Sequence, residues 1–182
     1  TPSLEVINCG GSDLTFLVRN LGNESISSFQ IDYTVNGQEF NYIWNGTLQP
    51  NETTQVVVTN ENWIRGNTTI NANVIFANDT FSNNNSVSIT FLNNDSGTVG
   101  VVNTFETDDS YLLTSQEGSS TLWQRGVPSG TLLNTTTSGT NVYGTNLNGN
   151  YTDNTQAFLY SQCYNLTEII NPVMKFKMAY DL

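Results

Sequence analysis

Few residues in this chain could carry out chemistry, and histidine is absent from all 182 positions. Histidine is the side chain whose unperturbed pKa suits proton transfer and metal ligation near neutral pH. Ser-His-Asp, Cys-His and histidine-metal chemistry are therefore excluded together. No CxxC pair, phosphate-binding GxxxxGK[ST] loop or HExxH helix takes their place. We predict a protein that binds, spaces or scaffolds and is not an enzyme.

The two cysteines, Cys9 and Cys163, stand 154 positions apart. In an oxidising compartment they could close one long disulfide. Isolated cysteines are also common as small buried apolar residues. We predict two buried thiols in preference to a Cys9–Cys163 disulfide.

Carboxylates offer two kinds of candidate site. Asp32 and Glu39 flank the turn sequence Asn36-Gly37, and two facing acids could serve glycoside hydrolysis. Because no pocket-forming insertion surrounds them, we interpret them as ordinary surface carboxylates on paired strands. Glu106, with Asp108 close behind it, follows an apolar stretch and could supply oxygen ligands to a structural calcium. The alternative for Glu106 and Asp108 is a solvated acidic turn, which we favour.

A second oxygen-rich corner contains Asp79 and the run Asn83-Asn84-Asn85. We predict an Asx turn there, because Asp and Asn side chains readily bond to the backbone two residues on. Among the aromatic residues, the alternating set Phe40, Tyr42 and Trp44 is predicted to fill a core, although such a row can also stack on sugars. Trp63, in a polar loop, is the better candidate for an exposed ligand-binding residue.

β-Strands must position these residues, since the chain is rich in Asn, Thr, Ser and Gly and poor in helix formers. Period-two alternation predicts seven short strands in the first half, joined by turn sequences such as Asn36-Gly37. Seven strands in about ninety residues predict an immunoglobulin-like sandwich. The expected strands are 4–8, 14–19, 29–35, 39–44, 54–59, 69–76 and 86–91.

A polar stretch with no apolar periodicity, 93–99, is the predicted linker to a second domain. There, longer polar loops separate the expected strands, and the final one, 173–180, alternates cleanly. Its predicted buried face, Met174, Phe176, Met178 and Tyr180, needs an opposing sheet. We expect further strands beyond Leu182, or a strand from another copy, to cover it. The other expected strands are 101–105, 123–125, 141–143 and 157–160, with Trp123 packed in the core.

Charge and processing signals restrict the partners. With five Lys and Arg against 16 Asp and Glu, the formal net charge is −11. This balance disfavours nucleic acid and anionic membranes. No apolar run is long enough to cross a bilayer, and the first residues are unlike a signal peptide; we expect a soluble chain, processed or cut from a longer one. Ten Asn-x-Ser/Thr sequons occur, a slight excess that leaves glycosylation open.

The first half contains three further sequence features: a strand followed by Asn20-Leu21-Gly22-Asn23, a hairpin at Ile31-x-Tyr33-x-Val35-Asn36-Gly37, and Leu48-x-Pro50. With the stretch from Asp79 to Asn85 before the last strand, they resemble the CARDB-type adhesion module of secreted bacterial proteins, over residues 1–92. The resemblance implies an adhesive or spacer role without catalysis.

Residues 100–182 contain an ordered series of motifs: Phe105-Glu106, 123–130, 139–143, 147–151 and 159–166. On this series the segment resembles part of the MAM-like jelly rolls of bacterial surface proteins and secreted peptidases. The resemblance implies a structural calcium near Glu106, and it places further strands after the last residue.

The predicted architecture is thus all-β, with two tandem β-sandwiches, immunoglobulin-like and then an incomplete jelly roll. The predicted function is a non-catalytic, extracellular adhesion or spacer segment of a larger secreted or cell-surface protein. Its partners are expected to be neighbouring domains or copies of itself, with surface glycans or proteins as further possibilities. Two alternatives stay open: the accessory region of a secreted peptidase or glycanase, and a carbohydrate-binding module.

Overall fold

The chain is all-β in the computed structural model, which describes residues 7–11, 13–59, 64–107, 112–117, 123–151, 153–154 and 156–180. Its contacts divide into two compact units, Thr1–Asp95 and Ser96–Leu182. The division falls inside the predicted linker 93–99. Part of that linker is nevertheless strand, because the last strand of the first unit runs through Asn93 and Asn94, both buried.

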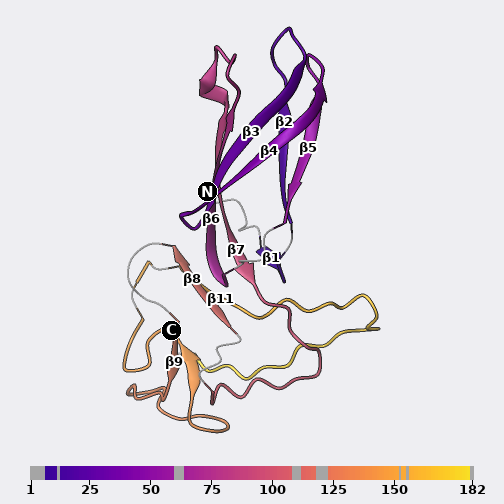
Figure 1. Ribbon diagram of the computed structural model, residues 1–182. Coiled ribbons are helices and arrows are strands. Elements are labelled where there is room, and N and C mark those ends of the chain that lie inside the picture. Colours follow the sequence, from indigo (N-terminus) through magenta and orange to yellow (C-terminus); the bar gives the residue numbers. More distant parts are fainter. Residues whose placement is uncertain are drawn as a thin grey trace. The chain divides into compact units, whose positions relative to one another are not determined.

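Unit 1 contains a five-stranded sheet in the order β1-β7-β6-β3-β4 and a two-stranded sheet of β2 and β5 (Figure 1). β1 pairs with β7 in parallel, and every other pair in the two sheets is antiparallel. The strands are β1 (Ile7–Cys9), β2 (Leu14–Arg19), β3 (Ile26–Val35), β4 (Gln38–Leu48), β5 (Thr53–Val58), β6 (Gly66–Ile75) and β7 (Ser86–Asn94), with one short 3-10 turn, η1 (Ser82–Asn84).

Alternation along the strands places one face of each sheet in a shared core. In β3, for example, Phe29, Ile31, Tyr33 and Val35 are all buried, whereas the residues between them are not. Both sheets contribute to this core, so the sandwich architecture predicted for the first half is confirmed. The buried cluster is Leu14, Phe29, Ile31, Tyr33, Val35, Leu48, Val56, Val58, Ile70 and Ala72.

The hairpin between β3 and β4 has the predicted turn. Asn36 and Gly37 have φ angles of 50° and 84°, as a two-residue turn of the kind that matches strand twist requires. Val35 therefore pairs directly with Gln38, and the register continues to Phe29 opposite Trp44.

Unit 2 is all-β in its regular elements but has little sheet. β8 (Leu113–Glu117) pairs with β11 (Gln156–Tyr160), and β9 (Gln124–Gly126) pairs with β10 (Val142–Gly144). The strands expected at 123–125, 141–143 and 157–160 are therefore present, each within a residue or two.

Two expected strands of unit 2 are wrong. Residues 101–105 and 173–180 form no strand. In the second segment the predicted buried face is exposed, and Met174, Phe176, Met178 and Tyr180 are 68–75% accessible. Alternation is necessary for a half-buried strand but is not sufficient, because a strand also needs a neighbour that accepts its backbone hydrogen bonds.

Candidate functional site

Glu106 is held at the centre of a hydrogen-bonded turn in unit 2. Its Oε1 accepts bonds from the backbone N–H groups of Thr140 at 3.0 Å and Asn141 at 2.9 Å. Its Oε2 accepts the Thr140 hydroxyl at 2.7 Å and the Asn141 side-chain amide at 3.1 Å. These bonds, the Asn141 N–H first among them, lower the pKa of Glu106 below its ordinary value. Gly139, with a φ of 63°, leaves space for the carboxylate, since a Cβ there would collide with it.

The backbone before Glu106 is fixed by its neighbours. Phe105 has a φ of 64°, a region that costs a non-glycine residue energy unless the surroundings impose it. Its carbonyl accepts Arg125 Nη1 at 2.7 Å, and its N–H donates to Asn103 Oδ1 at 3.0 Å. Its ring meets Tyr143 edge-on at 5.2 Å between centroids. Contacts from β9 and β10 thus direct Glu106 towards the 139–141 turn.

The four hydrogen bonds give Glu106 a structural role in fixing the 139–141 turn. All four bonds to its oxygens come from donors, which also repel a cation, so calcium could reach the carboxylate only by displacing them. Asp108, the second predicted ligand, lies outside the described residues. Within the described part of the chain, no group of three or more His, Cys, Asp or Glu side chains could hold a metal ion. Calcium at Glu106 stays a prediction.

Asp32 and Glu39 lie on the same face of the hairpin, as diagonal neighbours. Asp32 is opposite Asn41, and Thr34 is opposite Glu39, which puts Cβ atoms roughly 7 Å apart in a regular sheet. Gln30 Nε2 donates to Asp32 Oδ1 at 2.6 Å. The two carboxylates line an open groove along the sheet surface.

The same sheet surface carries a continuous row of polar side chains, which we call the polar face. Hydroxyl and amide groups bond across its strands: Ser88 Oγ donates to Asn71 Oδ1 at 2.7 Å, and Asn71 Nδ2 donates to Thr34 Oγ1 at 3.3 Å. Ser86 Oγ makes the equivalent bond to Asn73 Oδ1 at 2.9 Å. No strand of the five-stranded sheet contains Lys or Arg. The polar face consists of Gln30, Asp32, Thr34, Glu39, Asn41, Asn71, Asn73, Ser86 and Ser88.

On the other face of the hairpin, side chains of the predicted aromatic row Phe40, Tyr42 and Trp44 point towards the core. Trp44 stacks on Phe29 with centroids 4.8 Å apart, and Phe40 stacks on Tyr33 at 5.3 Å. Phe40 and Trp44 pack against the buried cluster, as predicted, whereas Tyr42 remains 38% exposed. The ligand-binding candidate Trp63 lies outside the described residues.

The predicted Asx turn is present beside η1. Asp79 Oδ1 accepts the backbone N–H of Phe81 at 2.8 Å, and Oδ2 accepts Asn85 Nδ2 at 2.8 Å. These bonds, above all that from the Phe81 N–H, lower the pKa of Asp79.

Trp123, in unit 2, was predicted to pack in the core. Its indole donates to the carbonyl of Ala157 at 3.2 Å, and its side chain is half-buried.

The prediction of two thiols is wrong, because Cys9 and Cys163 are both disulfide-bonded. Cys9 ends β1 and is paired with Asn94, the last residue of β7. Cys163 forms a β-bridge with Ser96, and its carbonyl accepts a hydrogen bond from the Gly97 N–H at 2.7 Å. The sequence did not predict where the two cysteines lie, because each backbone pairing joins residues that are far apart in the chain.

Sequence reasoning assigned no role to Asn20, which organises one end of unit 1. It is 3% exposed, and its Nδ2 donates to the carbonyls of Glu24 at 2.8 Å and Leu48 at 3.0 Å. Its Oδ1 accepts the Gly22 N–H at 2.9 Å. The available signal was an Asn at the end of a strand, two residues before a Gly, which is typical of an Asx turn.

Comparison with known proteins finds likeness at the level of structure only. No family model matches the chain, and no curated protein matches it. The CARDB domain of a Pyrococcus furiosus protein, solved in complex with di-metal ions, is similar in structure with a TM-score of 0.40 and 22% identity. The match covers 48% of this chain and 78% of that domain. The similarity described above does not support the MAM-like resemblance of residues 100–182.

The helical content of the described residues is a single short turn, and none of it has the length and apolarity of a membrane-spanning helix.

Proposed function

We propose that this chain is a non-catalytic extracellular module that serves adhesion or spacing within a longer secreted or cell-surface protein. The polar face is the observation that carries the proposal. Its hydroxyl and amide groups form an open, pre-ordered surface with acceptors on Asp32 and Glu39. Such a surface suits contact with an extended, hydroxyl-rich partner better than enclosure of a small substrate, which usually needs a concave and largely apolar pocket.

The state of the cysteines supports an extracellular location. Disulfides persist in oxidising compartments and are rare in the cytosol, and Cys9 and Cys163 are both disulfide-bonded. The low content of charged residues, 12%, fits a surface whose solubility depends on Asn, Ser and Thr.

The second unit is proposed to be a MAM-like jelly roll on the strength of its ordered sequence series, with Glu106 fixing the 139–141 turn. The carbohydrate-binding alternative differs from the leading proposal only in the partner. It is favoured by the same polar face, because paired amides and carboxylates can bond to vicinal sugar hydroxyls.

Two measurements test the function. Beads coated with the chain should be retained on immobilised cell-surface polysaccharide, and Asp32→Ala with Asn73→Ala should abolish retention. Gln55→Ala is the matched control, since Gln55 is exposed on β5, away from the polar face. Retention that survives the double variant would reject the polar face as the adhesive surface.

The second measurement assays the purified chain against peptide, ester and glycoside libraries. We expect no rate above background. A rate that disappears in Asp32→Asn or Glu39→Gln would overturn the non-catalytic proposal.

A further inference from the structure

We propose that residues 173–180 of one copy add as a strand to the free edge of β4 in a second copy. The inference concerns how copies of this chain associate, and it stands or falls separately from the proposed function. It rests on a match between an unpaired segment in unit 2 and an unprotected edge in unit 1.

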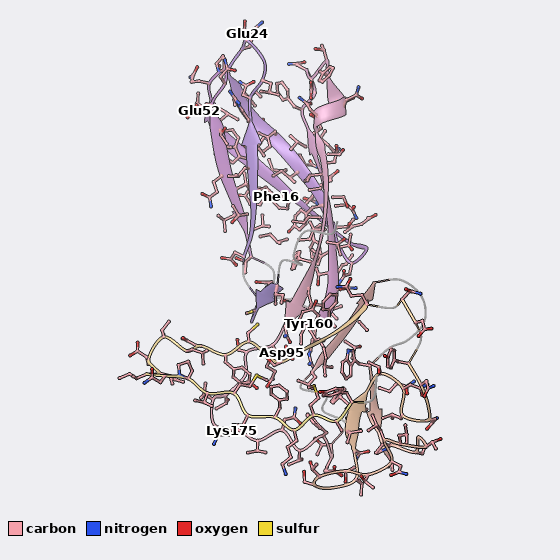
Figure 2. The ribbon with its side chains drawn as sticks, turned by 180° about the vertical axis from the view of Figure 1, so that it is seen from behind. Phe16, Glu24, Glu52, Asp95, Tyr160 and Lys175 are labelled. Atoms are coloured by element: carbon pink, nitrogen blue, oxygen red, sulfur yellow. The ribbon has the colours of Figure 1, made fainter. Side chains whose placement is uncertain are left out.

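The donor segment has the pattern of a strand, but no strand of the described residues pairs with it. In Val173-Met-Lys-Phe-Lys-Met-Ala-Tyr180, large apolar residues alternate with Lys175, Lys177 and Ala179. All eight residues are exposed and none is assigned to a strand. Removing large apolar side chains from water is favourable, so covering the four on one face would stabilise the association. Lys175, on this segment, is labelled in Figure 2.

The acceptor is β4, the last strand of the five-stranded sheet. β3 is its hydrogen-bonded neighbour on one side, and among the described strands none lies on the other. In a hairpin with a two-residue turn, the residues that flank the turn bond to each other, and this pattern alternates along the strands. Because Val35 and Gln38 flank the turn, the backbone groups of Glu39, Asn41 and Ile43 point away from β3 and are available to an added strand.

β4 also lacks the usual protection of an edge. Natural edge strands are commonly blocked by lysine, proline or inward-pointing charge. In its 11 residues β4 contains one charged residue, Glu39, and no Lys or Pro. It is also long for a strand, since most have five or six residues, and it could pair with all eight residues of the donor.

Both faces of the donor match the two faces of β4. On the core side, Tyr42 is 38% exposed, because the two-stranded sheet opposite is narrower than the five-stranded one. The Met174, Phe176, Met178 and Tyr180 face would extend the core over it. On the polar face, Lys175 and Lys177 would lie beside Glu39, in a sheet that contains no basic residue.

Charge selects a second copy as the occupant. Both lysines of the chain are in the donor segment, and the rest of the chain has three arginines against 16 acidic residues. Opposite charge on the two surfaces steers association and fixes orientation. Since donor and acceptor are different surfaces, the contact is heterologous and produces rings or open chains of copies.

Sedimentation of the full chain over a range of concentrations tests the proposal. The wild-type chain should form dimers and higher species that dissociate on dilution. Lys175→Glu with Lys177→Glu should weaken association about tenfold or more, because two attractive contacts become repulsive. The matched control, Lys175→Arg with Lys177→Arg, should associate like the wild type. A wild-type chain that stays monomeric at millimolar concentration would overturn the proposal.

A mixing experiment locates the acceptor. The Lys175→Glu, Lys177→Glu chain keeps its acceptor edge but not its donor, whereas Asn41→Pro keeps the donor and loses an edge N–H. Proline is tolerated where the N–H faces outward from an edge strand. Each variant alone should be monomeric. The mixture should form a 1:1 dimer that does not grow further, because it has no second intact pair of donor and acceptor.

Glu39→Lys is the second acceptor variant, in case Asn41→Pro perturbs the fold. It should associate poorly with wild-type donor and well with the Lys175→Glu, Lys177→Glu donor. A mixture without heterodimers, or charge variants that associate with equal strength in every combination, would rule out the β4 edge.

Discussion

Asn20 gives the sharpest prediction about stability, because one buried side chain holds two connections together. Its side chain bonds to Gly22 and Glu24 in the β2–β3 connection and to Leu48 at the end of β4. Its backbone N–H donates to Glu52 at 2.9 Å. Figure 2 shows Glu24 and Glu52 at the same end of unit 1.

Asn20→Ala removes three side-chain hydrogen bonds from a residue that is 3% exposed. Each bond contributes about 0.5–1.5 kcal/mol net, so we expect a loss of about 1.5–4.5 kcal/mol in the free energy of unfolding. For a domain near one hundred residues, this lowers the Tm by about 4–8 °C per kcal/mol. Denaturant unfolding, followed through amide signals of the unit 1 strands, measures it without interference from unit 2.

Asn20→Asp keeps the shape but replaces the donor. A carboxylate oxygen would then face the carbonyls of Glu24 and Leu48, so at neutral pH this variant should be at least as unstable as Asn20→Ala. Burial and the two carbonyls raise the pKa of the new carboxyl in the folded state. Folding therefore favours the protonated form. The loss in the free energy of unfolding relative to the wild type should be smaller at low pH and should grow as the pH rises through the folded-state pKa.

Asn45→Ala is the control, since Asn45 is exposed on β4 and an exposed substitution usually changes stability by less than about 0.5 kcal/mol. If Asn20→Ala were no more destabilising than this control, the assignment of Asn20 as an organising residue would be refuted.

Three further predictions concern single positions. Gly46→Ala should destabilise unit 1 by about 1–3 kcal/mol, measured by denaturation, since the added Cβ would lie 2.5 Å from the Trp44 ring. Glu106→Gln should make the stability of unit 2 less dependent on pH in acid. Because folding lowers the pKa of Glu106, the stability that its carboxylate contributes is present above the unfolded-state pKa and is lost as the pH falls through the folded-state pKa. An acid unfolding transition that is the same in the variant and the wild type would contradict this. If calcium binds at Glu106, a hundredfold excess over its Kd adds about 2.7 kcal/mol, and melts unaffected by calcium and chelator, or equally affected in Glu106→Ala, would reject that site.

The parts of the fold that follow from sequence are those with local causes. Period-two alternation located the strands of unit 1, and Asn36-Gly37 fixed the β3–β4 register, because a turn that requires positive φ leaves few alternatives. The inward row of Phe40 and Trp44 followed from the same alternation.

The parts that could not be predicted depend on partners distant in sequence. Residues 173–180 alternate as well as any strand in unit 1, yet they form no strand, and alternation carries no information about a strand partner. The same holds for Cys163, because no local sequence pattern predicts its β-bridge backbone pairing with Ser96. For Glu106 the sequence left a calcium ligand and a solvated acidic turn open, with the turn favoured. Its four bonds to the 139–141 turn could not be predicted, because they join residues more than thirty positions apart.

The composition of unit 1 links the polar face to the free edge. A sheet surface made of Asn, Ser and Thr is ordered by cross-strand hydrogen bonds, such as that from Ser88 to Asn71, and it does not need lysine or glutamate for solubility. The same lack of charge removes the side chains that normally protect an edge strand. An alternating basic segment with one apolar face would be complementary to such an edge, and both lysines of the chain lie on a segment of that kind, 173–180. We therefore propose that one surface chemistry serves both contact with hydroxyl-rich partners and association between copies.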